Sequence, residues 1–242
     1  MKIAVIGGTG LIGSQVVTDL RAAGHEAVPH SKSTGTDVIS GQGLDDALRG
    51  ADVVVNLTNS PTFDEASPAF FQTSMDNLLT AADRAGVGHF VILSIVGVDR
   101  VPELDYYKAK LLQEQILAAG PVPYSIVRAT QFMDFMDAVL SWTADGDTVR
   151  LPATPIQPIA SKDVARAVAE VAAGAPLNGI RSVAGPEVFT LDELGRITLS
   201  HKGDDRTVVT DPTAGMFAAV KGDVLTDKNA HLAPTRYTDW LS

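Results

Sequence analysis

The sequence predicts a doubly wound α/β fold, in which helices cover both faces of a parallel sheet. Short apolar, β-branched runs alternate with helical patterns along most of the chain, which is typical of parallel sheets. In addition, the run Lys2–Ile6 has the composition of a buried strand and is followed at once by four glycines, at positions 7, 8, 10 and 13. A helical pattern begins at Leu11. Strand, glycine turn and helix in this order form the context of a dinucleotide-binding fingerprint.

The glycine turn supplies what a pyrophosphate needs. One glycine permits a tight turn, another lets the backbone approach the phosphates, and a third lets the helix pack on the strand. Two spacings fit, with the first glycine at either Gly7 or Gly8. The N–H groups at the start of the helix complete an anion site. The residues of this turn that we expect to bind a dinucleotide are Gly7, Thr9, Gly10, Leu11, Ile12 and Gly13.

The remaining elements follow in order. The first helix is predicted to end near Gly24. We expect strands at 25–29, 37–39, 52–57, 89–94, 124–127, 145–151 and 180–184, and helices at 44–48, 67–85, 104–119, 161–173 and from 190. The helical stretches 67–85 and 131–142 are so apolar that they could close a core or a homodimer, and monomer and homodimer both stay open. We expect one domain over 1–242, with a cofactor-binding body over about 1–150 and a smaller substrate-side lobe over 151–242.

Composition narrows the class of protein. With 242 residues, 45% hydrophobic and 20% charged, the chain can bury a sizeable core. Its net charge of −10 argues against a nucleic-acid partner. The chain has no cysteine, its five histidines show no ligand spacing, and no apolar run approaches the length of a membrane span. We therefore expect no metal site, no membrane partner and a cytoplasmic location.

Four stretches resemble the atypical branch of the short-chain dehydrogenase/reductase superfamily that comprises the NmrA-like NAD(P)-binding proteins. They are GGTGLIGS at 7–14, SIVGVD at 94–99, YYKAKLLQE at 106–114 and VRATQFM at 127–133. The resemblance covers roughly residues 1–190 and implies a Rossmann-like fold with a nicotinamide dinucleotide cofactor. It also implies that Val38 lies near the adenine and that Leu57 and Thr58 touch the central portion of the cofactor.

The stretch after the second strand bears on the choice of cofactor. An NAD-preferring site places an acidic residue about 20 residues past the glycines, on the ribose hydroxyls. No acid occurs from Ala27 to Gly35, whereas Ser31 and Lys32 could meet a 2′-phosphate, with His30 as a further candidate. The sequence therefore favours NADP, and NAD is possible.

The resemblance also implies a catalytic triad of Ser94, Tyr106 and Lys110. Tyr106 would donate a proton to the substrate oxygen as hydride arrives, Ser94 would hydrogen-bond that oxygen, and Lys110 would lower the pKa of the tyrosine and bind the nicotinamide ribose. The four-residue spacing puts Tyr106 and Lys110 on one helix face, and Glu114 supports this alignment.

We therefore predict an oxidoreductase that transfers hydride to a small carbonyl, quinone or similar acceptor. The substrate would be apolar or aromatic, with Phe132, Met133, Phe135 and Met136 lining its pocket. NmrA-like relatives often lack the triad and serve as dinucleotide-sensing regulators. The alternative prediction is therefore a non-enzymatic sensor that binds a protein partner.

Overall fold

The computed structural model describes residues 1–62, 64–220 and 222–242. The chain forms two compact units, one made of 1–128 with 164–181 and the other of 129–163 with 182–242. These units differ from the expected division into a body over about 1–150 and a smaller lobe over 151–242, because each unit is made of two separate segments of the chain. The chain leaves the first unit at Arg128, returns to it at Val164 and leaves it again after Arg181.

A seven-stranded sheet confirms the predicted fold class, and its strand order is β12-β9-β5-β4-β3-β1-β2. β1 pairs in parallel with β2 and β3, β3 with β4, and β9 with β12. The strands are β1 (Lys2–Ile6), β2 (Glu26–His30), β3 (Val53–Asn56), β4 (His89–Ile95), β5 (Tyr124–Ala129), β9 (Gly179–Ala184) and β12 (His231–Leu232). The strands β1, β3 and β4 are near-continuous apolar runs, as is typical of a parallel sheet with both faces covered.

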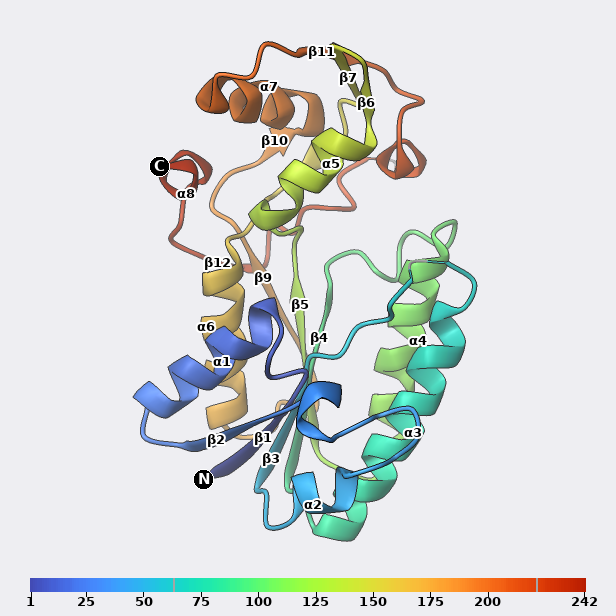
Figure 1. Ribbon diagram of the computed structural model, residues 1–242, viewed down its shortest axis with the longest axis vertical. Coiled ribbons are helices and arrows are strands. Elements are labelled where there is room, and N and C mark those ends of the chain that lie inside the picture. The colour runs from blue at the N-terminus through green and yellow to red at the C-terminus, as the bar shows by residue number, and fades with distance from the viewer. Residues whose placement is uncertain (63, 221) are drawn as a thin grey trace. The chain divides into compact units, whose positions relative to one another are not determined.

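Helices cover both faces of the sheet in the first unit. Figure 1 shows α3 and α4 on one face and α1 and α6 on the other. The helices of this unit are α1 (Leu11–Ala22), α2 (Leu44–Leu48), α3 (Ser67–Ala85), α4 (Asp105–Ala119) and α6 (Ser161–Ala173). The buried face of α3, including Met75, Leu78 and Leu79, packs into the core of this unit. The apolar stretch 67–85 therefore closes a core.

The strand predicted at 37–39 is wrong, because these residues lie in a turn. The neighbouring strand β2 contains Pro29, which has no N–H to donate to a further strand, and proline is confined to sheet edges for that reason. The segment instead closes on itself, since the Asp37 amide donates to the Gln42 carbonyl at 2.9 Å and the Asp37 side chain accepts from the Ile39 amide at 2.9 Å. β2 is consequently the last strand of the sheet. A short 3₁₀ turn, η1 (Lys32–Thr34), follows it.

The second unit has its own small core. The elements of this unit are η2 (Met133–Phe135), α5 (Met136–Trp142), β6 (Ala144–Asp145), β7 (Thr148–Leu151), β8 (Pro155–Ile156), β10 (Phe189–Thr190), α7 (Leu191–Lys202), β11 (Thr207–Thr210), η3 (Met216–Ala219) and α8 (Tyr237–Leu241). The predicted strand at 145–151 is the short β6–β7 hairpin. Thr190 and Glu193 form a capping box at the start of α7, as predicted from the sequence.

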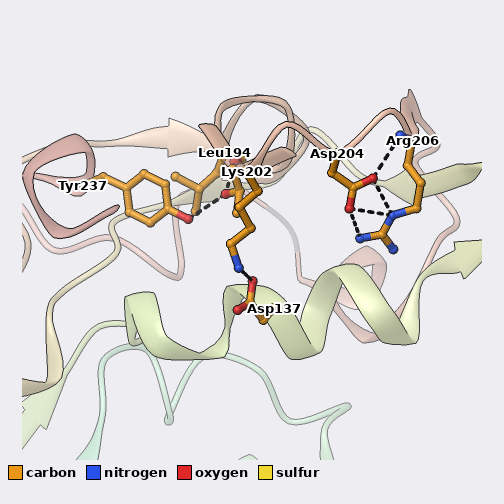
Figure 2. A network of polar contacts seen from close by, with 7 residues as sticks. Asp137, Leu194, Lys202, Asp204, Arg206 and Tyr237 are labelled. Atoms are coloured by element: carbon orange, nitrogen blue, oxygen red, sulfur yellow. Dashed lines mark hydrogen bonds and ion pairs between the residues drawn. The ribbon is translucent and has the colours of Figure 1, made fainter. Parts of the chain in front are cut away.

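Polar contacts fix the C-terminal part of this unit. Figure 2 shows Lys202 of α7 reaching Asp137 of α5. The buried Tyr237 of α8 shares a hydrogen bond of 2.6 Å with the hydroxyl of Thr198 on α7. The segment after 201, which carries no recognisable motif, is therefore an integral part of the second unit.

Candidate active site

The glycine turn joins β1 to α1, and close backbone contacts explain three of its glycines. Gly7 has a φ of +77°, which a side chain rarely adopts. A Cβ on Gly8 would lie 2.6 Å from the Val5 carbonyl oxygen, and a Cβ on Gly13 would lie 2.2 Å from the Gly7 carbonyl oxygen. The amides of Gly7 and Gly8 both donate to the His30 carbonyl, at 2.8 and 3.2 Å. The fold itself therefore requires glycine at these positions.

Gly10 differs from these glycines, because the protein alone does not explain it. It has an ordinary φ of −79° and is the N-cap of α1. A Cβ there would meet only the Gly7 carbonyl oxygen, at 3.4 Å, which is close to an ordinary contact. Among the described residues, no side chain caps this helix. Thr9, Gly10 and Leu11 are exposed, so the first-turn N–H groups are open to an anion. A pyrophosphate fits this turn, while the side chain of Ile12 is buried beneath it.

The end of β3 lies directly beside the glycine turn. A Cβ on Gly7 would lie 2.9 Å from the carbonyl carbon of Leu57 and 3.1 Å from the amide of Thr58. Asn56 shapes this segment, because its Oδ1 accepts from the Thr58 amide at 3.0 Å and from the Thr58 hydroxyl at 2.7 Å. The structure thus brings the predicted residues Leu57 and Thr58 next to the predicted phosphate turn.

The residues expected to meet the adenosine part of the cofactor differ in their exposure. Ser31 and Lys32 follow β2, whose last residue contacts the glycine turn through its carbonyl. The Ser31 hydroxyl pairs with that of Ser33 at 2.8 Å, and the exposed Lys32 reaches the carboxylate of Asp37 at 3.4 Å. Val38 is only 8% exposed and packs in the core. Its side chain therefore offers little surface to an adenine.

Ser94 lies near the end of β4, where ligands of open α/β sheets bind. Its side chain is 3% exposed. Its hydroxyl is buried and has no hydrogen-bond partner among the described residues. An unpartnered buried hydroxyl costs free energy, so such a group marks a candidate site for a ligand.

Tyr106 lies in the first turn of α4, and its hydroxyl donates to the side-chain Oδ1 of Asn59 at 2.7 Å. Burial raises the pKa of Tyr106 to about 12, against a smaller lowering by the bond to Asn59. The expectation that Lys110 lowers this pKa is therefore wrong for this structure. Desolvation of the phenolate dominates, and the hydrogen bond to the neutral amide of Asn59 has the smaller effect.

Lys110 is 5% exposed and points into the protein. Its Nζ donates to the Leu93 carbonyl at 2.7 Å and to the Gln113 Oε1, and it lies 5.0 Å from the centre of the Phe71 ring. Burial lowers the pKa of Lys110 to about 7, although the charge of Glu114 opposes that shift. At neutral pH the amine is consequently divided between its charged and neutral forms.

The three predicted catalytic residues belong to one region. Lys110 bonds to the carbonyl of the residue before Ser94. The centre of the Phe71 ring lies 5.0 Å from the Nζ of Lys110 and 6.5 Å from the centre of the Tyr106 ring. Sequence reasoning missed Asn59 and Gln113, because each is defined by a side-chain contact across the fold or within a helix rather than by a motif.

Glu114, which supported the alignment of the triad, has a structural partner. It is 4% exposed and receives two hydrogen bonds from Arg128 of β5, at 2.9 and 2.6 Å. Arg128 also reaches Asp99 at 3.2 Å. This bidentate pair ties α4, which carries Tyr106 and Lys110, to the sheet.

Two of the four residues expected to line a substrate pocket are core residues. Met133 and Met136 are 1% and 3% exposed and belong to the core of the second unit. Phe135 is exposed, and its ring stacks on that of Phe132 with centres 5.7 Å apart. Of the three interpretations of 131–142, namely buried core, pocket wall or dimer contact, a core is thus correct for the methionines.

Among the residues that the structure describes, no group of three or more His, Asp or Glu side chains is placed to hold a metal ion. Within the same part of the chain, no helix combines the length and the apolar character that crossing a bilayer requires.

The chain belongs to the NAD(P)H-binding family, whose sequence pattern matches residues 7–174. This match includes the glycine turn and all three candidate catalytic residues. The family assignment agrees with the sequence resemblance and establishes the nicotinamide dinucleotide as the cofactor class, without deciding between its two forms.

Two relatives differ in the roles that their names give. The (4-alkanoyl-5-oxo-2,5-dihydrofuran-3-yl)methyl phosphate reductase of Streptomyces griseus is 30% identical over 210 residues, which are 79% of this chain and 70% of that protein. The photosystem II assembly factor Ycf39 of Synechocystis is 27% identical over 150 residues, which are 55% of this chain and 45% of that protein.

A solved structure confirms the fold over the whole chain. A nucleoside-diphosphate-sugar epimerase from Staphylococcus aureus superposes with a TM-score of 0.75 and covers 100% of this chain and 99% of its own, at 16% identity. At that identity the likeness concerns the fold alone.

Proposed function

We propose that this protein is an NAD(P)H-dependent oxidoreductase that reduces a small carbonyl, quinone or similarly activated acceptor. When bound, the dinucleotide supplies the hydride. The observation that carries the proposal is the hydroxyl of Ser94, buried and without a partner among the described residues at the end of β4. There it would donate to the substrate oxygen and stabilise the negative charge that develops on it.

Tyr106 is the proposed general acid. Its pKa of about 12 keeps the phenol protonated at neutral pH, so its proton is available. In the structure this proton is held by Asn59. To act as an acid, the hydroxyl turns from the Oδ1 of Asn59 to the substrate oxygen. Asn59 holds the protonated tyrosine in place until the substrate arrives.

Lys110 is the proposed ribose ligand and electrostatic partner of the reaction. Its charged form has three N–H groups, and Leu93 and Gln113 accept two hydrogen bonds from them. A third N–H is then available to a ribose hydroxyl. A ribose oxygen that accepts this hydrogen bond would favour the charged form of the lysine over the neutral one.

We also propose that NADPH is preferred over NADH. The segment 27–35 carries no carboxylate, and Ser31 and Lys32 follow the strand that contacts the glycine turn. The pair between Lys32 and Asp37 is exposed on the lysine side and therefore weak. A 2′-phosphate, with its higher charge, would compete for the lysine. Titrations with NADPH and NADH test this preference, and tighter binding of NADH would contradict it.

We propose an apolar or aromatic substrate from the apolar composition of 131–142 alone. The name of the Streptomyces griseus relative supports a reductase, because that protein is 30% identical to this chain. The test of the proposed activity is the loss of NADPH absorbance with a panel of quinones, aldehydes and ketones. Turnover of at least one class supports the proposal.

The second candidate function is that of a dinucleotide sensor that binds a protein partner. It is favoured by the hydrogen bond that already engages the Tyr106 hydroxyl and by the match to a protein named as an assembly factor. Such a sensor would bind NADPH but oxidise none with any member of the panel. It would also capture a partner from its own cell extract in a manner that depends on the dinucleotide.

A further inference from the structure

Lys110 is embedded in a chain of buried polar contacts. Its Nζ bonds to the Oε1 of Gln113, one turn further along α4, and Gln113 is 0% exposed. A neutral amide oxygen is an unusual choice here, since a buried ammonium is normally paired with a carboxylate. The nearby Glu114 is occupied by Arg128. Gln113 is therefore the side chain that receives the lysine.

The chain of contacts continues to the predicted cofactor turn. The Nε2 of Gln113 points to the sulfur of Met75 at 3.8 Å, and the Nδ2 of Asn56 points to the same sulfur at 3.4 Å. Asn56 in turn fixes Thr58 through its Oδ1. Thr58 lies beside Gly7 in the glycine turn. Contacts to sulfur are weak individually, but they are made in a fully buried setting.

We propose that Gln113 is a positioning residue for the reaction, which holds the Nζ of Lys110 against the Leu93 carbonyl and links it through Met75 to Asn56. The inference rests on the proposed function, in which Lys110 binds the cofactor ribose. Gln113 would fix where the ammonium lies without contacting substrate or cofactor. As a neutral acceptor it adds no negative charge beside the lysine, so that the amine can change its charge near neutral pH.

The surroundings of Lys110 define what can influence its charge. On its own helix, Tyr106 precedes it by one turn and Glu114 follows it by one turn, and Glu114 is paired with Arg128 of β5. From α3, the Phe71 ring faces it, and Met75 contacts the adjacent Gln113; both are uncharged. From β4 it meets the backbone carbonyl of Leu93. A carboxylate at position 113 would be the closest negative charge.

The experiment uses the full-length protein labelled with ¹³C at the ε-carbon of lysine, and follows the titration of Lys110 by NMR. A Lys110→Met variant assigns its signal. Gln113→Glu is expected to raise the pKa of Lys110 by about 1–3 units, because it supplies an opposite charge. Gln113→Leu is expected to lower that pKa, because the charged form loses an acceptor. Since Gln115 lies on the same helix but is exposed, Gln115→Glu and Gln115→Leu are the matched controls and should leave the titration unchanged.

The pH profile of turnover provides the second measurement. In Gln113→Glu, the limb of this profile that follows the titration of Lys110 should move to higher pH together with the NMR titration. A merely structural role of Gln113 would lower the melting temperature and leave the pH profile and the NMR titration unchanged. If Lys110 titrates alike in the wild type and in Gln113→Glu, the proposal is overturned, even if Gln113→Leu does not fold. Because the NMR titration needs no turnover, it decides this proposal separately from the proposed activity.

Discussion

Replacing Gly10 by alanine separates the needs of the fold from those of the cofactor. At φ −79° with only one protein atom, at 3.4 Å, near the new Cβ, alanine is compatible with the folded backbone. The lower entropy of the unfolded chain favours alanine by about 0.4–1 kcal/mol, and the poorer fit of alanine at an N-cap offsets this gain, so stability should change little. The methyl group would nevertheless occupy the approach of the pyrophosphate to the turn. We expect NADPH affinity to fall by about tenfold or more, which corresponds to about 1.4 kcal/mol.

Gly13→Ala should show the opposite behaviour. Its Cβ would lie 2.2 Å from the Gly7 carbonyl oxygen and 2.7 Å from the Gly8 Cα, and both neighbours are backbone atoms. Overpacking of this kind costs about 1–3 kcal/mol or more, which outweighs the roughly 1 kcal/mol that alanine gains over glycine in a helix. The variant should therefore lose stability as well as affinity.

Gly88→Ala is the control, because its Cβ would make an ordinary 3.7 Å contact with the Asp52 carbonyl, away from the turn. Urea unfolding and calorimetric titration with NADPH are the assays for all three variants. Wild-type affinity in Gly10→Ala, or wild-type stability in Gly13→Ala, would refute the reasoning.

Three further predictions concern charged residues. Because burial lowers the pKa of Lys110 to about 7, the folded protein binds fewer protons than the unfolded chain between pH 7 and 10.5. The free energy of unfolding should accordingly rise with pH across that window, and Lys110→Met should flatten the rise in urea unfolding series. Glu114→Gln should lower the free energy of unfolding by about 3–5 kcal/mol, because it leaves the largely buried Arg128 without its bidentate partner. Asp99→Asn, which removes an exposed partner, should lower it by at most about 1 kcal/mol. Equal losses of the two variants in urea unfolding would contradict this. Lys32→Ala should weaken NADPH binding and leave NADH binding unchanged, and calorimetry would reveal an equal loss for both if the lysine does not meet the 2′-phosphate.

Local signals in the sequence were sufficient for most of the fold. The helix at 67–85 has the bounds that its periodicity predicted, and the turn between β1 and α1 follows from glycines within seven residues. The strand at 37–39 failed because its short apolar run is only weak evidence, while Pro29 deprives the neighbouring strand of a donor. The division into units was also beyond sequence reasoning, since it depends on the return of the chain to the first unit at Val164.

The candidate site shows the same limit more sharply. The family resemblance implied Ser94, Tyr106 and Lys110, but their electrostatics depend on contacts that a sequence motif does not encode. Asn59 meets Tyr106 across 47 residues of chain, and Phe71 reaches Lys110 from another helix. Burial, which no local pattern measures, raises the pKa of the tyrosine and lowers that of the lysine.

The central claim is that Tyr106 gives its proton to the acceptor during a reduction by NADPH. The most direct measurement is the turnover of Tyr106→Phe with the best acceptor of the panel. Tyr124→Phe, at the start of β5, is the control variant. Proton transfer of this kind typically contributes about 10²–10⁴-fold, so Tyr106→Phe should lose that much turnover with little change in NADPH affinity, while Tyr124→Phe retains both. Undiminished turnover in Tyr106→Phe would contradict the account.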